Sequence, residues 1–217
     1  MARKKQTDDQ RAARREEILD AAMHVFETQG GIAAVSFRNV AAKAGISYSA
    51  PYRYFTDKDD LLNALRARAF RWIESEMKQA MKSKRSATAK LEALARAYVT
   101  AGVSCPDRYE LMFFELDNTD IARNSLELRA AKNDALGVCT DVIIEGQESG
   151  AFSDHLDPLV ASHLFWTGAH GLVSLEVSGQ FVMGCTIDQL IAPLFQTLQS
   201  QILNSENQDS HTIAANG

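Results

Sequence analysis

Chain breakers are scarce in this sequence, and their scarcity constrains the fold more than any other feature. The 217 residues include only 4 Pro and 12 Gly, and long segments lack the turn clusters that separate short strands. Apolar residues recur instead at helical spacing. The clearest example is the stripe formed by Ile18, Leu19, Ala22, Val25 and Phe26. Together with a hydrophobic content of 46%, which is enough for a core, this pattern predicts an all-α protein.

About nine helices are expected. The first covers about residues 9–29 and ends at the Gly30-Gly31 pair. Ser36 is a natural N-cap for the second helix, and Gly45 supplies the left-handed turn that follows it. The further helices are expected at about 36–44, a short segment ending at 55, 57–83, 86–103, 106–116, 124–147, 158–179 and 187–202.

The short third helix lies in the segment "GISYSAPYRYF", which contains Pro51. If Ser47 is the N-cap, Pro51 is the fourth helical residue and its missing N–H forfeits only one intrahelical bond. If Ser49 is the cap, Pro51 occupies the second position without difficulty. Ala50 precedes the proline and is therefore biased away from the helical region, which favours the later start or a distorted first turn.

Charge is unevenly distributed along the chain. The net charge is -5, yet residues 1–56 carry nine basic against six acidic side chains, whereas residues 57–217 carry 14 against 22. A basic N-terminal segment followed by an acidic remainder suits a protein that binds phosphates with its N-terminal part only. The basic arm within residues 1–8, with Arg3, Lys4 and Lys5, is expected either to be a solvated tail or to contact phosphates or a nucleic-acid minor groove.

Several classes of protein are not indicated by the sequence. No apolar run is long enough to span a membrane, and the N-terminus lacks the apolar core of a signal peptide, so we expect a cytoplasmic protein without membrane contact. Cys105, Cys139 and Cys185 are widely spaced and odd in number, which argues against a disulfide framework and a zinc site. No cofactor, metal or catalytic motif is expected.

The first three helices have the spacing of a helix-turn-helix unit, whose second helix enters the major groove of DNA. Once Ile46, Phe55 and part of Tyr52 pack inward, the third helix presents polar and aromatic side chains to DNA. Acidic residues are absent from Thr28 to Thr56. Lys58 at the start of the fourth helix adds a phosphate donor.

The blocks "ILDAAMHVFETQG", "SFRNVAAKAGIS" and "PYRYFTDKDDLL" resemble, at the right separations, the DNA-binding region of the TetR family of bacterial transcription regulators. The block "FWTGAHGL" is similar to the Trp, His and Gly signature of one subclass of TetR C-terminal domains. The resemblance implies DNA contacts at Ser36, Arg38, Tyr48, Ser49, Ala50, Tyr52, Arg53, Tyr54 and Lys58. Many relatives have Gly-Thr-Leu at positions 49–51; Ala50 therefore offers only methyl contacts, for example to thymine.

We expect residues 1–56 to form the DNA-binding domain, residues 57–204 a helical regulatory and dimerisation domain, and residues 205–217 a disordered tail. One helix-turn-helix makes too few phosphate contacts for tight binding, so a homodimer on a palindromic operator is expected. The resemblance implies that the last two helices form the dimer interface. Phe195, Leu198 and Ile202 are the candidates, with burial inside the subunit as the alternative.

The resemblance also implies a pocket for a small-molecule effector among the middle helices. Candidates for its lining are Trp72, Phe113, Phe114, Trp166 and His170. The ordinary alternative for Trp166 and His170 is core packing with a satisfied hydrogen bond. His163 and His170 are about 10 Å apart along a helix, too far to share one metal ion.

The resulting hypothesis is a DNA-binding transcriptional regulator, acting as a repressor that a small-molecule effector releases from its operator. It would reside in the cytoplasm and associate with the nucleoid through DNA. The competing hypothesis is a helical protein-binding adaptor whose helix-turn-helix no longer functions. An adaptor would be expected to lose Arg38, Arg53 and Lys58, all of which this chain keeps. An enzyme is the main rival from another class, but no catalytic constellation is found in the sequence.

Overall fold

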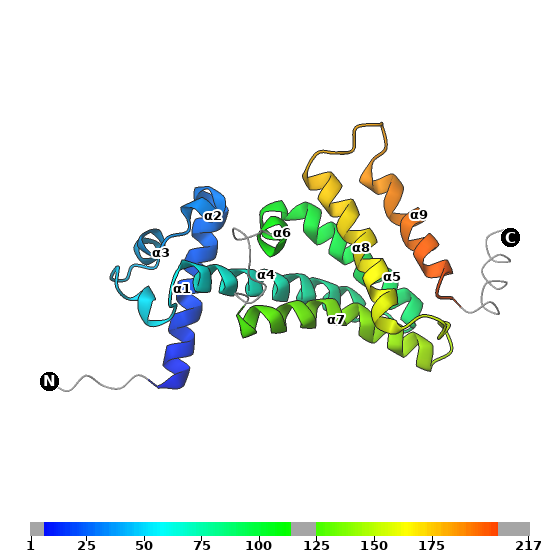
Figure 1. The fold of residues 1–217 in the computed structure, drawn as a ribbon, viewed down its shortest axis with the longest axis horizontal. Coiled ribbons are helices and arrows are strands. Elements are labelled where there is room, and N and C mark those ends of the chain that lie inside the picture. The colour runs from blue at the N-terminus through cyan, green and yellow to red at the C-terminus, as the bar shows by residue number, and fades with distance from the viewer. Residues whose placement is uncertain (1–6, 114–124, 204–217) are drawn as a thin grey trace. The chain divides into compact units, whose positions relative to one another are not determined.

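The structure, a computed structural model, describes residues 7–113 and 125–203. Its regular elements are helical, which confirms the expected all-α class (Figure 1). In chain order they are α1 (Asp8–Gln29), α2 (Gly31–Ala34), α3 (Phe37–Lys43), the 3₁₀-helix η1 (Pro51–Arg53), α4 (Lys58–Met81), α5 (Ala87–Ser104), α6 (Pro106–Phe113), α7 (Leu126–Glu148), α8 (Pro158–Val177) and α9 (Ile187–Ser200). Three predicted features, the basic arm at residues 3–5, Phe114 and the tail after residue 204, lie outside the described residues.

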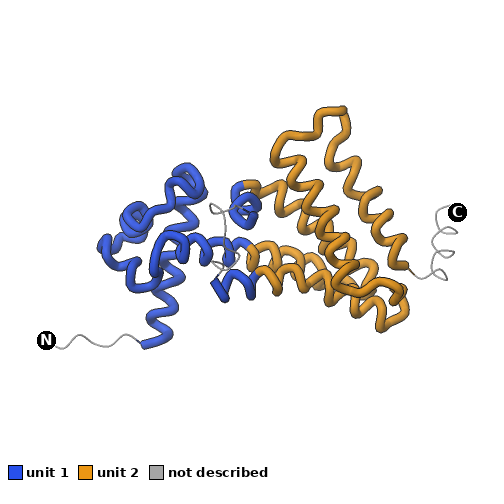
Figure 2. The backbone as a smooth tube through the Cα atoms, in the orientation of Figure 1, with its two compact units in different colours: residues 1–69, 107–131 blue, residues 70–106, 132–217 orange. Residues whose placement is uncertain are grey.

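The contacts divide the chain into two compact units (Figure 2). The first consists of Met1–Ala69 and Asp107–Ala131, and the second of Phe70–Pro106 and Lys132–Gly217. Helices α4 and α7 each contribute residues to both units. The expected end of the DNA-binding domain, at residue 56, falls inside the first unit. That domain boundary remains a prediction.

In the first unit, a capping box starts α1. The Gln10 N–H donates to the Thr7 hydroxyl at 3.2 Å, and the Thr7 N–H donates to the Gln10 side chain at 3.1 Å. The helix ends at Gly30, whose φ of 111° only glycine adopts easily. The five residues of the predicted apolar stripe are all buried in this unit. The expected helix over residues 9–29 is thereby confirmed.

Helix α2 was not expected, because the Gly30-Gly31 pair indicates only a break. The chain instead forms one short turn of helix before α3. The predicted cap of α3 is confirmed, since the Ser36 hydroxyl accepts a hydrogen bond from the Asn39 N–H at 3.2 Å. Gly45 follows in the left-handed conformation with φ 64°, also as predicted.

In the second unit, α5 packs on α8 and α9, and α8 packs on α9. The rings of Phe165 and Phe195 stack with centroids 6.4 Å apart. A Cβ at Gly168 would lie 3.1 Å from a methyl group of Leu198, so this glycine allows the close approach of α9. Phe195 and Ile202 are 3% and 2% exposed, so the subunit itself buries them, which is the alternative stated for these two candidates.

At the end of α7, Phe152 packs against Gly146. The Phe152 N–H donates to the Gly146 carbonyl at 2.9 Å, and the Ser153 N–H donates to the Ile202 carbonyl at 2.7 Å. The ring of Phe152 is 1% exposed and lies directly over Gly146. The turn after α7 is therefore packed against the end of the last helix in this unit.

None of the helices within residues 7–113 and 125–203 combines the length and the hydropathy that a membrane-spanning helix needs.

Candidate nucleic-acid interface

The segment between α3 and α4 carries most of the candidate DNA contacts. It begins with a turn in which the Ile46 N–H donates to the Ala41 carbonyl and the Ala50 N–H donates to the Ser47 carbonyl, at 3.0 and 2.9 Å. Pro51 is the first residue of η1, and no side chain caps this short helix. The favoured later, distorted start is therefore confirmed, but Ser49 is not its cap and Pro51 is the first helical residue, not the second or the fourth. Because Pro51 has no N–H, Ala50 takes the Ser47 carbonyl in a tighter i to i+3 pattern.

Two buried side chains anchor this segment to its unit. Pro51 is buried and Phe55 is 1% exposed, and the Phe55 N–H donates to the Pro51 carbonyl at 3.0 Å. Arg15 of α1 places its guanidinium 5.0 Å from the centre of the Phe55 ring. The expected inward packing of Phe55 is confirmed.

Tyr52 packs partly inward, as expected, and its contact with DNA remains a prediction. Its ring meets that of Phe37 edge-on, with centroids 4.4 Å apart, yet the residue is 50% exposed. Its hydroxyl oxygen lies 3.1 Å from that of Tyr48, which is 58% exposed. This hydrogen bond, with some desolvation, raises the pKa of Tyr52. A tyrosine hydroxyl can donate to a phosphate or accept from a base edge.

The remaining candidates in the segment between α3 and α4 differ in exposure. Ser49 and Arg53 are exposed, and Ala50 and Tyr54 are half-buried. The guanidinium of Arg53 has no partner among the residues described. It is therefore free to bind an external acceptor.

Helix α3 and the start of α4 contribute the other donors. Arg38 is exposed, and within the described part of the chain its guanidinium has no partner. The neighbouring Asn39 is occupied, because its side-chain amide donates to the Ala34 carbonyl at 2.8 Å. Lys58 is exposed, with its Nζ 3.3 Å from the Ile32 carbonyl. Ser36 is committed to its cap but keeps a hydroxyl hydrogen to donate.

Arg11 is a further candidate for DNA contact that the family resemblance does not indicate. Its guanidinium donates to the Arg53 carbonyl at 3.4 Å and so links α1 to η1. Helix α1 carries three arginines near its start, but Arg14 pairs with Glu17 and Arg15 with Glu127 at 2.5 Å. The sequence contains one indication of this candidate. Only two acidic residues directly follow "RAARR", so they can pair with some of the three arginines but not with all.

The candidate effector residues are only partly brought together. In the second unit, the Trp166 indole N–H donates to the Tyr98 hydroxyl at 3.3 Å, and the Trp166 and His170 rings are 5.7 Å apart. Burial lowers the pKa of His170 below 6.5. Trp72 belongs to the same unit, whereas Phe113 belongs to the first unit, where its ring lies 5.0 Å from that of Tyr109. Over the described ranges, no cluster of three or more His, Cys, Asp or Glu side chains could hold a metal ion.

Comparison with protein families gives two matches. Residues 18–65 match the family described as bacterial regulatory proteins, tetR family. Residues 91–198 match the tetracyclin repressor-like C-terminal domain. The comparison with curated proteins gives no match.

Solved structures share the fold. A protein of unknown function from Rhodococcus sp. RHA1 is 22% identical with a TM-score of 0.74, covering 88% of this chain and 95% of that one. The fatty acid degradation regulator FadR from Bacillus halodurans is 21% identical with a TM-score of 0.67, covering 84% and 96%. The regulator FadR from Bacillus subtilis, in complex with stearoyl-CoA, is 22% identical with a TM-score of 0.64, covering 84% and 96%.

Proposed function

Because the chain belongs to the TetR family and is a DNA-binding transcriptional regulator, we propose that it is a homodimeric repressor that a small molecule releases from a palindromic operator. The observation that carries this proposal is the exposed surface of α3 and η1. Arg38 and Arg53 lie there with unpaired guanidinium groups among the described residues, in a segment without acidic side chains from Thr28 to Thr56. Such a surface attracts phosphates and offers donors for base edges.

The residues of this surface divide into two tasks. Arg38, Arg53 and Tyr48 would read base edges in the major groove, with the Ala50 methyl group against a thymine methyl. Lys58 and Arg11, nearer the helix termini of α4 and α1, would contact phosphates. Ser49, Tyr54 and the Ser36 hydroxyl would complete the backbone contacts. Two such surfaces about 34 Å apart would match successive major grooves on one face of the DNA.

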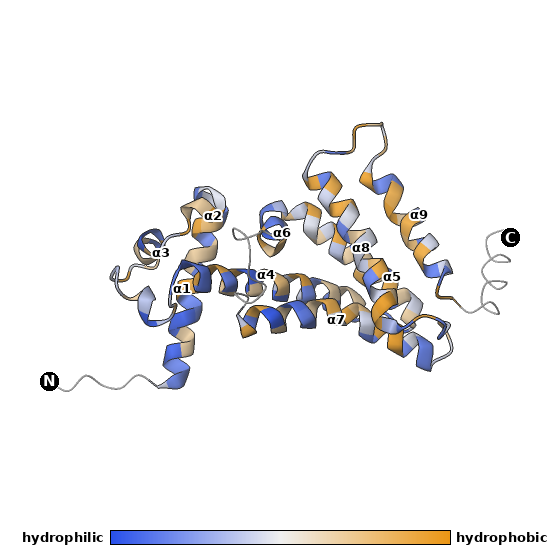
Figure 3. Ribbon diagram, in the orientation of Figure 1, coloured by the Kyte–Doolittle hydropathy of each residue, from blue (hydrophilic) through white to orange (hydrophobic). Residues whose placement is uncertain are grey.

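The dimer surface is proposed on the exposed stripe of α8. Val160, Leu164, Gly171 and Leu175 follow one another at helical spacing, and the three apolar side chains are 51%, 46% and 43% exposed. Figure 3 shows apolar residues along α8 and α9. The partly exposed Leu198 remains a candidate, whereas buried Phe195 and Ile202 would support the interface from inside.

The dimer is tested by light scattering on purified protein. The double variant Leu164→Glu with Leu175→Glu should be monomeric because it places charges in an apolar interface. Ile144→Glu changes an exposed isoleucine on α7 and serves as the matched control, which should stay dimeric. A dimeric double variant would locate the interface elsewhere.

The effector is proposed to bind near Trp166, His170 and Tyr98, where aromatic rings and two polar groups converge. The stearoyl-CoA complex of the Bacillus subtilis regulator makes acyl-CoA thioesters the first compounds to test. Compounds that raise the thermal midpoint of unfolding should also lower operator affinity.

The experiment that tests the function is salt-dependent binding of the purified protein to DNA from its own promoter region. We expect specific binding that strengthens as salt falls, and its loss in the variant Arg38→Ala with Arg53→Ala. A scrambled duplex of equal length is the control. Weak binding that ignores sequence would favour the protein-binding adaptor instead.

A further inference from the structure

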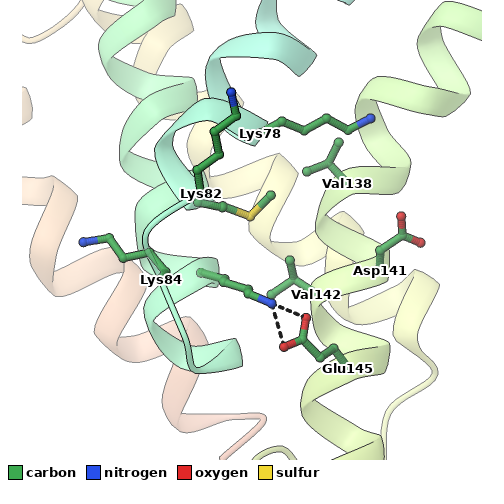
Figure 4. A pocket seen from close by; sticks show the side chains of 9 residues that line it. Lys78, Lys82, Lys84, Val138, Asp141, Val142 and Glu145 are labelled. Carbon is green, nitrogen blue, oxygen red and sulfur yellow. Dashed lines mark hydrogen bonds and ion pairs between the residues drawn. The ribbon is translucent and has the colours of Figure 1, made fainter.

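A pocket of about 430 Å³ lies in the second unit, between the end of α4, the start of α5 and one face of α7. Figure 4 shows Lys78, Lys82 and Lys84 on the α4 side and Val138, Asp141, Val142 and Glu145 along α7. The Lys84 side chain points away from α7 in this view, and as an exposed, flexible side chain it would turn toward a bound anion. The Trp166 and His170 cluster does not line it. Its volume is in the range of small-molecule sites, which are typically about 300–1,000 Å³.

The lining is dominated by lysines, but they are not equivalent. Lys90 donates to both carboxylate oxygens of Glu145, at 2.7 and 2.6 Å, and Lys78 pairs with Glu74 at 2.5 Å. Lys82 and Lys84 are exposed, and their ammonium groups have no partner within the described ranges. These two lysines therefore provide the positive charge available to a ligand.

The local sequence adds no competing acid on this side. Residues 77–91 contain five basic and no acidic side chains. Two carboxylates on α7 line the pocket, Asp141 and Glu145. Lys90 neutralises Glu145, so the negative charge of Asp141 is the one that an anion would meet. An anion between the two sides would be attracted by Lys82 and Lys84 and repelled by Asp141.

The interior of the pocket is apolar. Val138 and Val142 are 4% exposed and Met81 is half-buried, so their side chains form a floor behind the charged rim. Inorganic phosphate has no apolar part and would leave these side chains exposed to water. A ligand that combines an anionic group with a small hydrocarbon body would cover them and remove apolar surface from water.

We propose that this pocket binds a small organic anion, a phosphate ester or a carboxylate, whose charged group meets Lys82 and Lys84 and whose apolar body rests on Met81, Val138 and Val142. The ligand is a small molecule rather than a nucleic acid because the site is concave and its apolar floor offers nothing to a phosphate backbone. The proposal concerns binding only and does not depend on the protein being a repressor.

The test is calorimetric titration of the full chain at low ionic strength with phenyl phosphate, phthalate and inorganic phosphate. Saturable binding of phenyl phosphate or phthalate, several-fold tighter than inorganic phosphate, is expected because of the apolar floor. Comparing the first two probes identifies which anionic group the lysines prefer. Inorganic phosphate binding as tightly as both, or no saturable binding of either organic probe, would overturn the proposal.

Variants locate the site. Lys82→Ala with Lys84→Ala should weaken binding about tenfold, since each removes a charge-assisted contact. Asp141→Asn should tighten it, because a repelling charge is removed. The variant Arg38→Ala with Arg53→Ala, which loses the same number of charges from the DNA surface, should bind the probe unchanged. If this last variant loses the probe and the lysine variant keeps it, the anion site is on the DNA surface and the pocket proposal fails, while the proposed DNA binding stands.

Discussion

The hydroxyl oxygens of Tyr48 and Tyr52 lie 3.1 Å apart on the surface proposed to meet DNA, and the Tyr52 ring rests edge-on against Phe37 of α3. The core of the first unit thus orients Tyr52, and Tyr52 orients Tyr48. Tyr48 is then presented in one position before DNA arrives, which lowers the entropy lost on binding.

This relationship predicts coupling between the two hydroxyls. Tyr48→Phe and Tyr52→Phe should each weaken operator binding about fivefold, with little change in stability because the rings remain. The double variant should be scarcely weaker than either single one, since both singles break the same bond. Fluorescence anisotropy with operator DNA measures all three, and strictly additive losses would show that the two hydroxyls act independently.

Arg38 and Lys58 should differ in the kind of DNA binding they support. Arg38→Ala is expected to lower the preference for operator over random duplex, because it removes a donor to base edges. Lys58→Ala is expected to weaken both duplexes about equally and to reduce the salt dependence, because it removes a phosphate contact. Equal losses on both duplexes for both variants would contradict this division.

Gly146 should not tolerate a side chain. A Cβ there would lie 2.0 Å from the buried Phe152 ring, so Gly146→Ala should lower the free energy of unfolding by about 2 kcal/mol or more. Gly137 on the same helix has nothing within 4 Å of its Cβ position, and Gly137→Ala should raise stability by about 0.5–1 kcal/mol. Urea denaturation of the two variants checks both signs, and equal effects would show that the Phe152 contact is unimportant.

Stability should fall as pH drops below neutrality, partly because of His170. Burial lowers the pKa of this imidazole below 6.5 in the folded state, so the unfolded chain takes up a proton first as the pH falls. The unfolded state is then favoured from about pH 7 downward. His170→Gln should therefore lose less stability between pH 7.5 and 5 than the unchanged protein, as measured by urea denaturation at each pH. Identical slopes would assign the pH dependence to other groups.

The three cysteines should separate into two classes. Burial raises the pKa of the Cys139 thiol to about 12, whereas Cys105 and Cys185 are partly exposed, and all three are free thiols. At pH 8 a thiol reagent should modify Cys105 and Cys185 in the native protein, with Cys139 reacting at least about a hundredfold more slowly. Cys139→Ala should leave the native count unchanged and lower the count in denaturant by one. Three thiols reacting at one rate would contradict the burial of Cys139.

Sequence reasoning predicted the features whose causes are local. The Ser36 cap, the left-handed Gly45 and the apolar stripe of α1 each depend on residues a few positions apart, and the structure confirms them. The start of η1 was predicted less well, because the spacing of Ser47, Ser49 and Pro51 does not show that the Ala50 N–H takes the Ser47 carbonyl and that no side chain caps the helix.

Features made by distant segments were beyond the sequence. The apolar face of α9 was evident, but whether Phe195 would meet Phe165 of its own subunit or a second subunit depends on the close approach at Gly168. The lysine-lined pocket joins residues near 82 to residues near 141, and no spacing in the chain indicates that they are neighbours. Arg11 was missed because its partner is a backbone carbonyl, which every residue has.

In the segment from Tyr48 to Phe55, the residues that anchor the segment to the core are different from those proposed to contact DNA. Pro51 and Phe55 are buried, whereas Tyr48, Ser49 and Arg53 are exposed. Exchanges at positions 48, 49 and 53 therefore remove few contacts inside the protein. A library randomised at these three positions should consist largely of folded proteins, from which versions with new operator preferences can be selected without redesigning the scaffold.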